Sequence, residues 1–248
     1  MTRVVNASVL LELPGGALLT DPYFQDHWFL RFGEPIGLRV ADLPRLAAVL
    51  GGHGVFDHWQ PRSLQGYPNA PTTPVLVASP RMVRSARRAG FSRADVLSWG
   101  ETRTVGDGIT VTSVPGERVA GMTTNSYVIA SGDTTVFVGT EARGLSAIRA
   151  VARSRRVDVA VLPIDGLRVL GYRLVMDARG ALDAAELLGA RTLIPIHYTQ
   201  RPIPALLQCP SGLADLARHA ATSAVAVQVC PAGVRTIVGD PVSRTRTP

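Results

Sequence analysis

Two short apolar runs in this chain each end in a segment that carries histidine. The run at residues 46–50 leads into residues 51–59, which read GGHGVFDHW, and the run at residues 193–196 ends at His197. Imidazole nitrogens and carboxylate oxygens both bind zinc and similar divalent cations. A strand that ends in a ligand-bearing loop also holds its ligands in place. Two such ends brought together would unite His53, Asp57, His58 and His197.

A structural role for these histidines is the competing interpretation. An isolated histidine is more often a surface residue or a hydrogen-bonded core residue than a ligand, and this interpretation is favoured for His27 and His219. For the cluster at residues 53–58, the residue types alone leave the ligand role and the structural role equally open.

The order of further landmarks favours the ligand role. The Asp57-His58 pair, with His53 before it, resembles the His-x-His-x-Asp-His motif of the metallo-β-lactamase superfamily. The likeness extends from residue 4 to residue 238 and is to the compact, lactonase-like hydrolases of that superfamily. Its other landmarks are LLTDPY at 18–23, VPGER at 114–118, VFVGTE at 136–141, LPI at 162–164, MDA at 176–178 and IPIHY at 194–198.

The chain departs from the family pattern at three positions. Val55 stands where the motif has its second histidine, Arg118 where the family has a mid-chain histidine, and Thr140 where it has a bridging aspartate, with Glu141 next to it. By this resemblance the first metal site keeps only His53. The second site keeps Asp57, His58 and His197 and lacks the shared bridging aspartate.

The resemblance therefore implies one divalent metal ion, held by Asp57, His58 and His197. Zinc is the first candidate; iron and manganese also suit two histidines and one carboxylate. Glu141 would be a fourth ligand or a base. A form of the protein without metal is the alternative.

A catalytic set of His53, Arg118 and Glu141 follows from the same resemblance. The guanidinium of Arg118 would be a fixed cation in the first metal's place, able to hold an oxyanion or stabilise developing negative charge. His53, free of metal, could act as a general acid or base near neutral pH. In the alternative reading, Arg118 makes only a surface ion pair with Glu117 and His53 has no role.

Aromatic residues gather in the loop-like stretch at 22–45, where related enzymes line their substrate pocket. Tyr23, Phe24 and Trp28, together with Tyr198 after the last histidine, are therefore predicted to contact the substrate. A packed loop or a contact between subunits would need the same side chains.

The composition of the chain limits the kinds of substrate and partner that we expect. The formal net charge is +7 and every basic residue is arginine, whose planar fork pairs well with carboxylate or phosphate, so a small anionic substrate is expected. The arginines are scattered and aromatic residues make up 6% of the chain, which argues against nucleic acid. The N-terminus lacks a secretory pattern and no apolar run reaches membrane length, so we expect a cytoplasmic protein without a membrane partner.

The remaining features concern organisation. With 248 residues and 46% hydrophobic content, residues 1–239 can form a single domain, followed by a disordered polar tail at 240–248. Cys209 and Cys230 have no metal-binding spacing, and whether they pair is open, as is a homo-oligomer.

Hydrophobic patterning predicts a mixed α+β fold, and the resemblance implies a four-layer αββα sandwich. The expected helices cover residues 79–89, 144–153, 177–188 and 211–221. The expected strands cover residues 4–13, 17–20, 74–78, 102–114, 125–130, 134–138, 157–162, 192–197, 224–230 and 234–238.

Three functions remain open at this stage. The first is a metal-dependent hydrolase that acts on a small ester, lactone or phosphorylated molecule. The second is a repurposed biosynthetic enzyme, with or without metal, that catalyses a dehydration, cyclisation or isomerisation. The third is a binding protein with a relic site.

Overall fold

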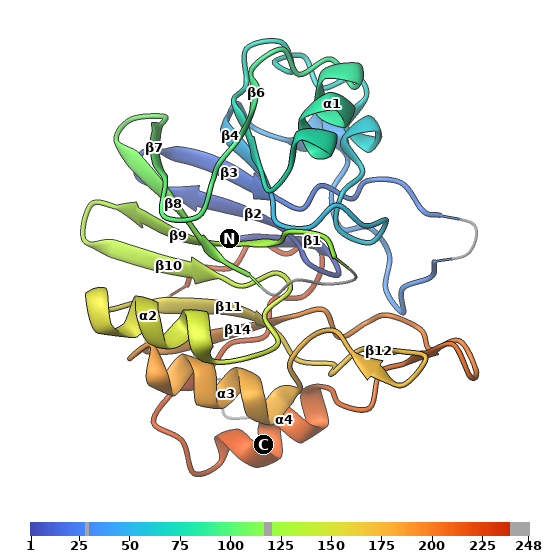
Figure 1. Cartoon of the computed structure of the whole chain (residues 1–248), viewed down its shortest axis with the longest axis vertical. Helices are drawn as coiled ribbons and strands as arrows, with labels where there is room; N and C mark the ends of the chain where they lie inside the picture. Colours follow the sequence, from blue (N-terminus) through green and yellow to red (C-terminus); the bar gives the residue numbers. More distant parts are fainter. Residues whose placement is uncertain (28–29, 117–120, 239–248) are drawn as a thin grey trace.

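A computed structural model describes residues 1–27, 30–116 and 121–238 of the chain. Two β-sheets face each other and helices cover their outer sides (Figure 1). The first sheet has the order β1-β2-β3-β4-β5-β6. Its strands are β1 (Thr2–Val5), β2 (Ser8–Leu13), β3 (Gly16–Thr20), β4 (Leu46–Gly51), β5 (Val75–Val77) and β6 (Ala94–Val96).

The second sheet has the order β16-β14-β11-β10-β9-β8-β7. Its strands are β7 (Thr102–Val105), β8 (Ile109–Pro115), β9 (Asn125–Ser131), β10 (Thr134–Val138), β11 (Val159–Pro163), β14 (Thr192–Ile196) and β16 (Ala226–Val227). A third, small sheet consists of β12 (Arg168–Val169), β13 (Tyr172–Arg173) and β15 (Leu207–Gln208).

Helices complete the layers. The helix α1 (Pro80–Arg88) packs on the first sheet, and α2 (Ser146–Ser154), α3 (Ala178–Leu187) and α4 (Leu213–Ala220) pack on the second. Short 3₁₀ turns, η1 (Val40–Asp42) and η2 (Pro61–Leu64), lie in the connections. The hydroxyl of Ser79 accepts from the Met82 amide at the start of α1, and the Asp177 carboxylate caps α3 in the same way, which satisfies amides that have no partner inside the helix.

The core between the sheets is apolar and closed. Val9, Leu18 and Leu50 of the first sheet belong to one buried cluster with Tyr127 and Val161 of the second. Two further clusters lie between each sheet and its helices. Both faces of each sheet are therefore covered by apolar side chains, as in sheets that pack against helices, and the predicted αββα sandwich is confirmed.

Local differences from the predicted elements have physical causes. The expected strand at 4–13 is broken at Asn6, whose φ of 50° lies in the left-handed region and turns the chain. The expected strand at 102–114 is broken at Gly106-Asp107-Gly108, where both glycines have positive φ. The expected strand at 234–238 is wrong, because only an isolated bridge between Thr2 and Arg235 forms there.

The topology brings several strand ends to one edge of the sandwich. β3, β4 and β5 run parallel to one another in the first sheet, as do β10, β11 and β14 in the second. The loops that follow these strands carry the histidines and acids singled out in the sequence.

No helix in the described part of the chain has the length and apolar content that crossing a bilayer requires. The prediction of one domain at 1–239 with a tail stays a prediction, since residues 239–248 lie outside the described ranges.

Candidate metal centre

Three strand ends supply the central side chains. The loop after β4 carries His53, Asp57 and His58, the loop after β10 carries Glu141, and His197 directly follows β14. The first two loops approach closely at Gly52, where a Cβ atom would lie 2.1 Å from Thr140 Oγ1. Only glycine fits at such a contact.

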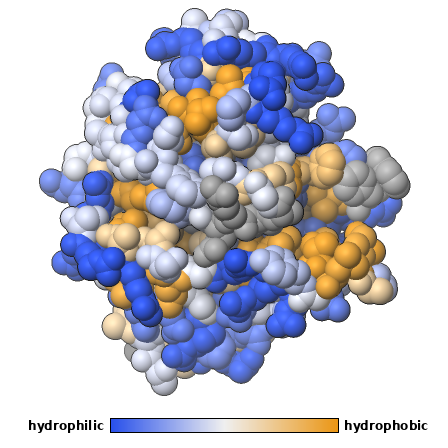
Figure 2. All heavy atoms as spheres, in the orientation of Figure 1, coloured by the Kyte–Doolittle hydropathy of each residue, from blue (hydrophilic) through white to orange (hydrophobic). Residues whose placement is uncertain are grey.

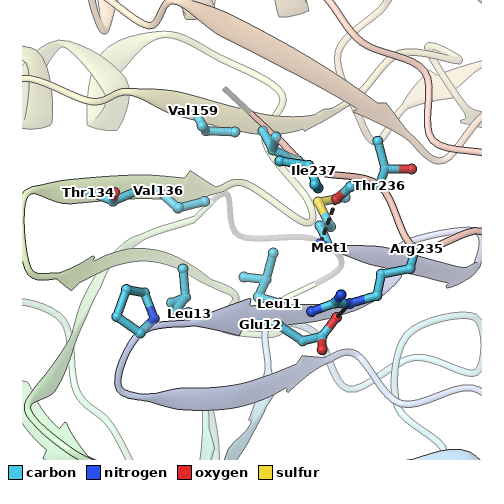
Figure 3. Close-up of a pocket in the computed structure, with 12 residues that line it drawn as sticks. Met1, Leu11, Glu12, Leu13, Thr134, Val136, Val159, Arg235, Thr236 and Ile237 are labelled. Atoms are coloured by element: carbon cyan, nitrogen blue, oxygen red, sulfur yellow. Dashed lines mark hydrogen bonds and ion pairs between the residues drawn. The ribbon is translucent and has the colours of Figure 1, made fainter. Parts of the chain in front are cut away.

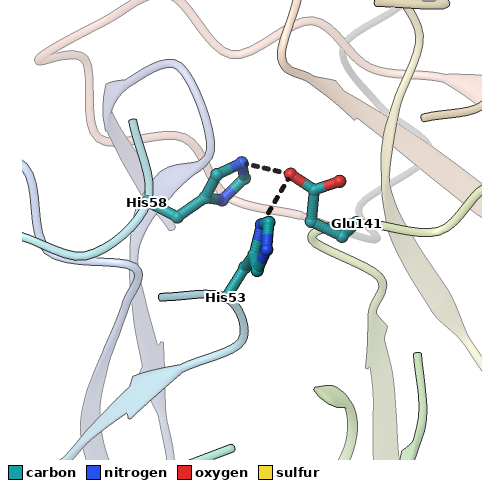
Figure 4. Close-up of side chains that lie close together, drawn as sticks. All are labelled: His53, His58 and Glu141. Atoms are coloured by element: carbon teal, nitrogen blue, oxygen red, sulfur yellow. Dashed lines mark ion pairs between the residues drawn. The ribbon is translucent and has the colours of Figure 1, made fainter. Parts of the chain in front are cut away.

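One group of ligand atoms consists of His53, His58 and Glu141 (Figure 4). Glu141 Oε1 lies 3.1 Å from His53 Nδ1 and 3.0 Å from His58 Nε2. All three side chains are buried, with at most 3% exposure. Nevertheless, both nitrogens of His53, His58 Nε2 and Glu141 Oε2 have no hydrogen-bond partner among the described residues. Buried polar atoms that converge without hydrogen-bonding geometry suit a shared cation better than a hydrogen-bond network.

The second group consists of Asp57, His58 and His197. Asp57 Oδ2 lies 3.2 Å from His197 Nε2 and 3.5 Å from His58 Nε2. The rings of the two histidines stack with their centroids 5.3 Å apart. Asp57 has 14% of its side chain exposed, whereas both histidines have none. The centre is therefore reached from the side of Asp57.

Two outer carboxylates orient these histidines. His58 Nδ1 donates to Asp21 Oδ2 at 3.0 Å, and His197 Nδ1 donates to Asp165 Oδ2 at 2.9 Å. The Gly52 amide fixes the other oxygen of Asp21, and the Leu167 amide fixes that of Asp165. Since a carboxylate only accepts, each Nδ1 carries the proton and each Nε2 is turned toward the centre. This is how proteins set the tautomer of a metal-binding histidine.

The charge of the centre calls for a cation. Four carboxylates, from Asp21, Asp57, Glu141 and Asp165, surround three imidazoles. Burial alone would lower the pKa of His197, but Asp165 and Asp57 raise it to about 10. Burial would likewise raise the pKa of Glu141, but the facing His53 and His58 hold it well below its usual range. A divalent ion could balance this negative charge in place of the protons, so the residues fit a metal.

The predicted site residues are partly brought together. Asp57, His58, His197, Glu141 and His53 all meet at the centre, and their individual roles stay predictions. The Thr140 hydroxyl is directed to the Asn125 carbonyl oxygen at 3.5 Å. Arg118 and Trp28 lie outside the described residues.

The aromatic residues that are predicted to contact substrate differ in their packing and hydrogen bonding. Tyr23 is fully buried and packs edge-on against Phe32, with ring centroids 5.1 Å apart. The Phe24 amide donates to Ser63 Oγ. The Tyr198 ring lies under the guanidinium of Arg3, 4.6 Å from ring centroid to Cζ. Whether these aromatic side chains contact substrate stays a prediction.

Sequence reasoning missed three contributors. Asp21 was noted only as part of the LLTDPY landmark, and Asp165 and Asn6 were not singled out. Asp165 directly follows the apolar run at 159–164, just as His197 follows the apolar run at 193–196. The pattern of a polar residue at the end of an apolar strand, which predicts the histidines, therefore also predicts this carboxylate.

Asn6 links two of the candidate ligands, His197 through its backbone and Asp57 through its side chain. Its carbonyl oxygen accepts from the His197 amide at 3.3 Å, and its Nδ2 donates to the Asp57 carbonyl oxygen at 3.4 Å. Asn6 and His197 both have left-handed backbone, with φ of 50° and 54°. Outside glycine and asparagine such a conformation is costly, and it clusters at functional sites.

We expect Asn6→Ala to weaken metal binding about tenfold, because alanine disfavours the left-handed turn that holds His197 and lacks the contact to Asp57. Asn6→Gly keeps the turn and loses only the side chain, so its loss should be smaller. Competition with a chromophoric chelator measures both. Equal affinity in Asn6→Ala and the unmodified protein would show that Asn6 does not position the ligands.

A separate hollow of about 300 Å³ lies far from this centre (Figure 3). It is lined by residues at the end of β2 and the beginnings of β10 and β11, whereas the ligands follow the ends of β4, β10 and β14. Its charged groups are already paired: Arg235 binds Glu12 at 2.8 Å, and the N-terminal amine donates to the Thr236 carbonyl oxygen. The hollow is therefore not part of the candidate centre.

An αββα sandwich with a histidine and carboxylate cluster at its strand ends defines a protein of the metallo-β-lactamase type. The model of the beta-lactamase superfamily domain matches residues 17–198. The chain therefore belongs to the beta-lactamase superfamily, as the sequence predicted.

Relatives and solved structures agree with this assignment. The chain is 28% identical to a metal-dependent hydrolase of Koribacter versatilis, over 82% of this chain and 85% of that one. It is 27% identical to a metal-dependent hydrolase of Methanopyrus kandleri, over 82% and 85%. The fold is similar to that of an isothiocyanate hydrolase from Delia radicum gut bacteria, with a TM-score of 0.75 at 19% identity over 95% and 97% of the two chains.

Proposed function

We propose that this protein is a hydrolase that works with one divalent metal ion. Asp57, His58 and His197 would bind the ion, with Glu141 as the fourth ligand. The observation that carries this proposal is that His58 Nε2 and His197 Nε2 face carboxylate oxygens of Asp57 and Glu141. Both histidines are held in this orientation by outer carboxylates on their Nδ1 atoms. The family and the names of its relatives support the hydrolase class.

His58 is the reason to expect one ion and not two. Its Nδ1 is used by Asp21, so only Nε2 is available to a metal. Both ligand groups contain His58 and therefore compete for this single atom. The group with His197 is favoured because both of its histidines have an orienting carboxylate, which makes an imidazole a better ligand.

The remaining residues have roles that follow from their positions. Asp57 is the most exposed of the proposed ligands, so an incoming substrate would approach the ion from its side. His53 faces Glu141 and is left over as a general acid or base. A bound divalent ion would supply Lewis acidity, lowering the pKa of water and polarising a carbonyl or phosphoryl oxygen.

For the substrate we propose a small ester, lactone or phosphorylated molecule. The centre is nearly closed, with exposure confined to Asp57, so only a compact reacting group can reach it. The formal net charge of +7 favours an anionic substrate through long-range attraction. Zinc suits the two histidines and carboxylates, and iron and manganese remain alternatives.

The test is the metal content of protein purified without chelator and without an affinity-tag metal. We expect about one zinc, iron or manganese per chain by elemental analysis, since the shared Nε2 of His58 leaves ligands for one ion. Metal-loaded and metal-stripped samples are then assayed on a panel of small esters, lactones and phosphates.

Two ions per chain would contradict the single-site assignment and require ligands beyond the two groups. Absence of metal after reconstitution with zinc, iron and manganese would reject the metal-dependent proposal. Equal turnover by loaded and stripped protein would reject it as well.

A further inference from the structure

A small apolar tip lies at the side of the main body (Figure 1), shortly after Asp165, which orients His197. It is formed by the third sheet, β13-β12-β15, and the turns that join its strands. It has its own buried cluster, of Leu167, Val175 and Leu207. Leu170, Tyr172 and Leu206 nevertheless point outward, with 77%, 56% and 44% exposure. Figure 2 shows apolar atoms gathered over this part of the molecule, near its right-hand edge.

Leu170 has a backbone conformation that is unfavourable for leucine, and its apolar side chain is exposed to solvent. The Leu170 amide donates to the Leu206 carbonyl oxygen at 2.9 Å, so the two exposed leucines lie together. Leu170 has a φ of 50° and precedes Gly171, whose φ is 80°, at a hairpin position where asparagine or glycine is favoured. A bulky side chain there costs conformational energy and gains little burial among the described residues, since Leu170 is 77% exposed. A strained and exposed apolar residue of this kind is a candidate for a functional contact.

The charge around the tip is positive. Residues 166–176 and 198–209 contain Arg168, Arg173 and Arg201 and no aspartate or glutamate. Arg168 and Arg201 are exposed. Arg173 pairs with Asp177 at 3.3 Å. The guanidinium of Arg143 lies over the Tyr172 ring, 5.2 Å from its centroid, and Arg143 Nη1 also donates to the Tyr172 hydroxyl.

We propose that this tip docks the protein on an anionic lipid surface, which would revise the expectation from the sequence that the protein has no membrane partner. Protruding leucines and an aromatic side chain surrounded by arginines are the composition with which peripheral proteins insert into the headgroup region of an anionic bilayer. A second copy of the chain fits less well, because apposed tips would bring arginines together on a protein that already has a formal net charge of +7. Nucleic acid would use the arginines but leave the leucines in water.

The test is sedimentation of the full chain with vesicles of phosphatidylcholine alone or with phosphatidylglycerol added. We expect binding only to the anionic vesicles, and weaker binding as salt is raised. Leu170→Asn should weaken binding about tenfold, because the apolar insertion is lost. It should not lower the melting temperature, since asparagine suits the left-handed turn. Arg168→Gln with Arg201→Gln should weaken binding by about 25-fold, at about fivefold for each charge.

Arg84→Gln is the matched control, because Arg84 is an exposed arginine on α1 and its loss changes the net charge without changing the tip. It should bind within about twofold of the unmodified protein. No binding to anionic vesicles, or equal binding by Leu170→Asn, would overturn the proposal. Self-association without lipid that Leu170→Asn abolishes would assign the tip to a second copy instead, and retention on nucleic acid but not on vesicles would assign it to that partner.

Discussion

Replacing His58 by alanine should remove the metal ion, whereas replacing His53 should leave most of it bound. His58 belongs to both groups of ligand atoms, and its Nε2 is the atom they share. His53 belongs to one group only. The loss of an outer hydrogen-bond partner already weakens metal binding by about 10- to 100-fold, so the loss of a shared ligand should exceed about 100-fold. Elemental analysis and chelator competition measure both variants.

The companion variant His197→Ala separates the two groups. If the ion is held with Asp57 and His197, this variant should lose metal as fully as His58→Ala does. His219→Ala, a histidine of α4 outside both groups, is the control and should keep its metal. An equal loss in His53→Ala and His58→Ala, with little loss in His197→Ala, would assign the ion to His53, His58 and Glu141.

The ligands themselves could be predicted from the sequence because their signal is local. His53, Asp57 and His58 lie within six residues after an apolar run, and His197 ends a run of the same kind. Parallel strands place such ends at one edge, so local signals add up to a site once the sheet forms. The helices were predictable for the same reason, since Ser79 and Asp177 mark where α1 and α3 begin.

What the sequence could not show depends on contacts between distant segments. Glu141 lies 3.0 Å from His58 Nε2 although the two residues are 83 positions apart in the chain, and the resemblance by itself gave it no defined contact. Asp21 and Asp165 orient histidines that are 37 and 32 residues away. The break in the predicted strand at Asn6 comes from a left-handed backbone that serves the His197 amide, which no periodicity reveals.

Replacing Arg3 by methionine should lower the melting temperature by about 6–12 °C. Arg3 has 1% of its side chain exposed and makes two hydrogen bonds to Glu34, one of them at 2.6 Å. Its Nε donates to the Cys230 carbonyl oxygen, and its guanidinium covers Tyr198. Breaking a buried pair costs about 3 kcal/mol or more because the remaining charge loses its counterion; Glu34 would keep only the hydrogen bond from the Thr199 hydroxyl. For a chain of this size, 1 kcal/mol is about 2–4 °C.

The double variant Arg3→Met with Glu34→Met decides whether the unpaired charge is the cause. Replacing a whole buried pair by apolar side chains is often nearly neutral, so we expect the double variant to recover most of the loss in differential scanning calorimetry. Arg39→Met is the control, since Arg39 and Asp42 form an exposed pair with 82% and 41% exposure and such pairs contribute little. If the double variant melts as low as Arg3→Met, the loss comes from packing on Tyr198 and the bond to Cys230. Because Tyr198 follows His197, that result would also predict weaker metal binding in both variants.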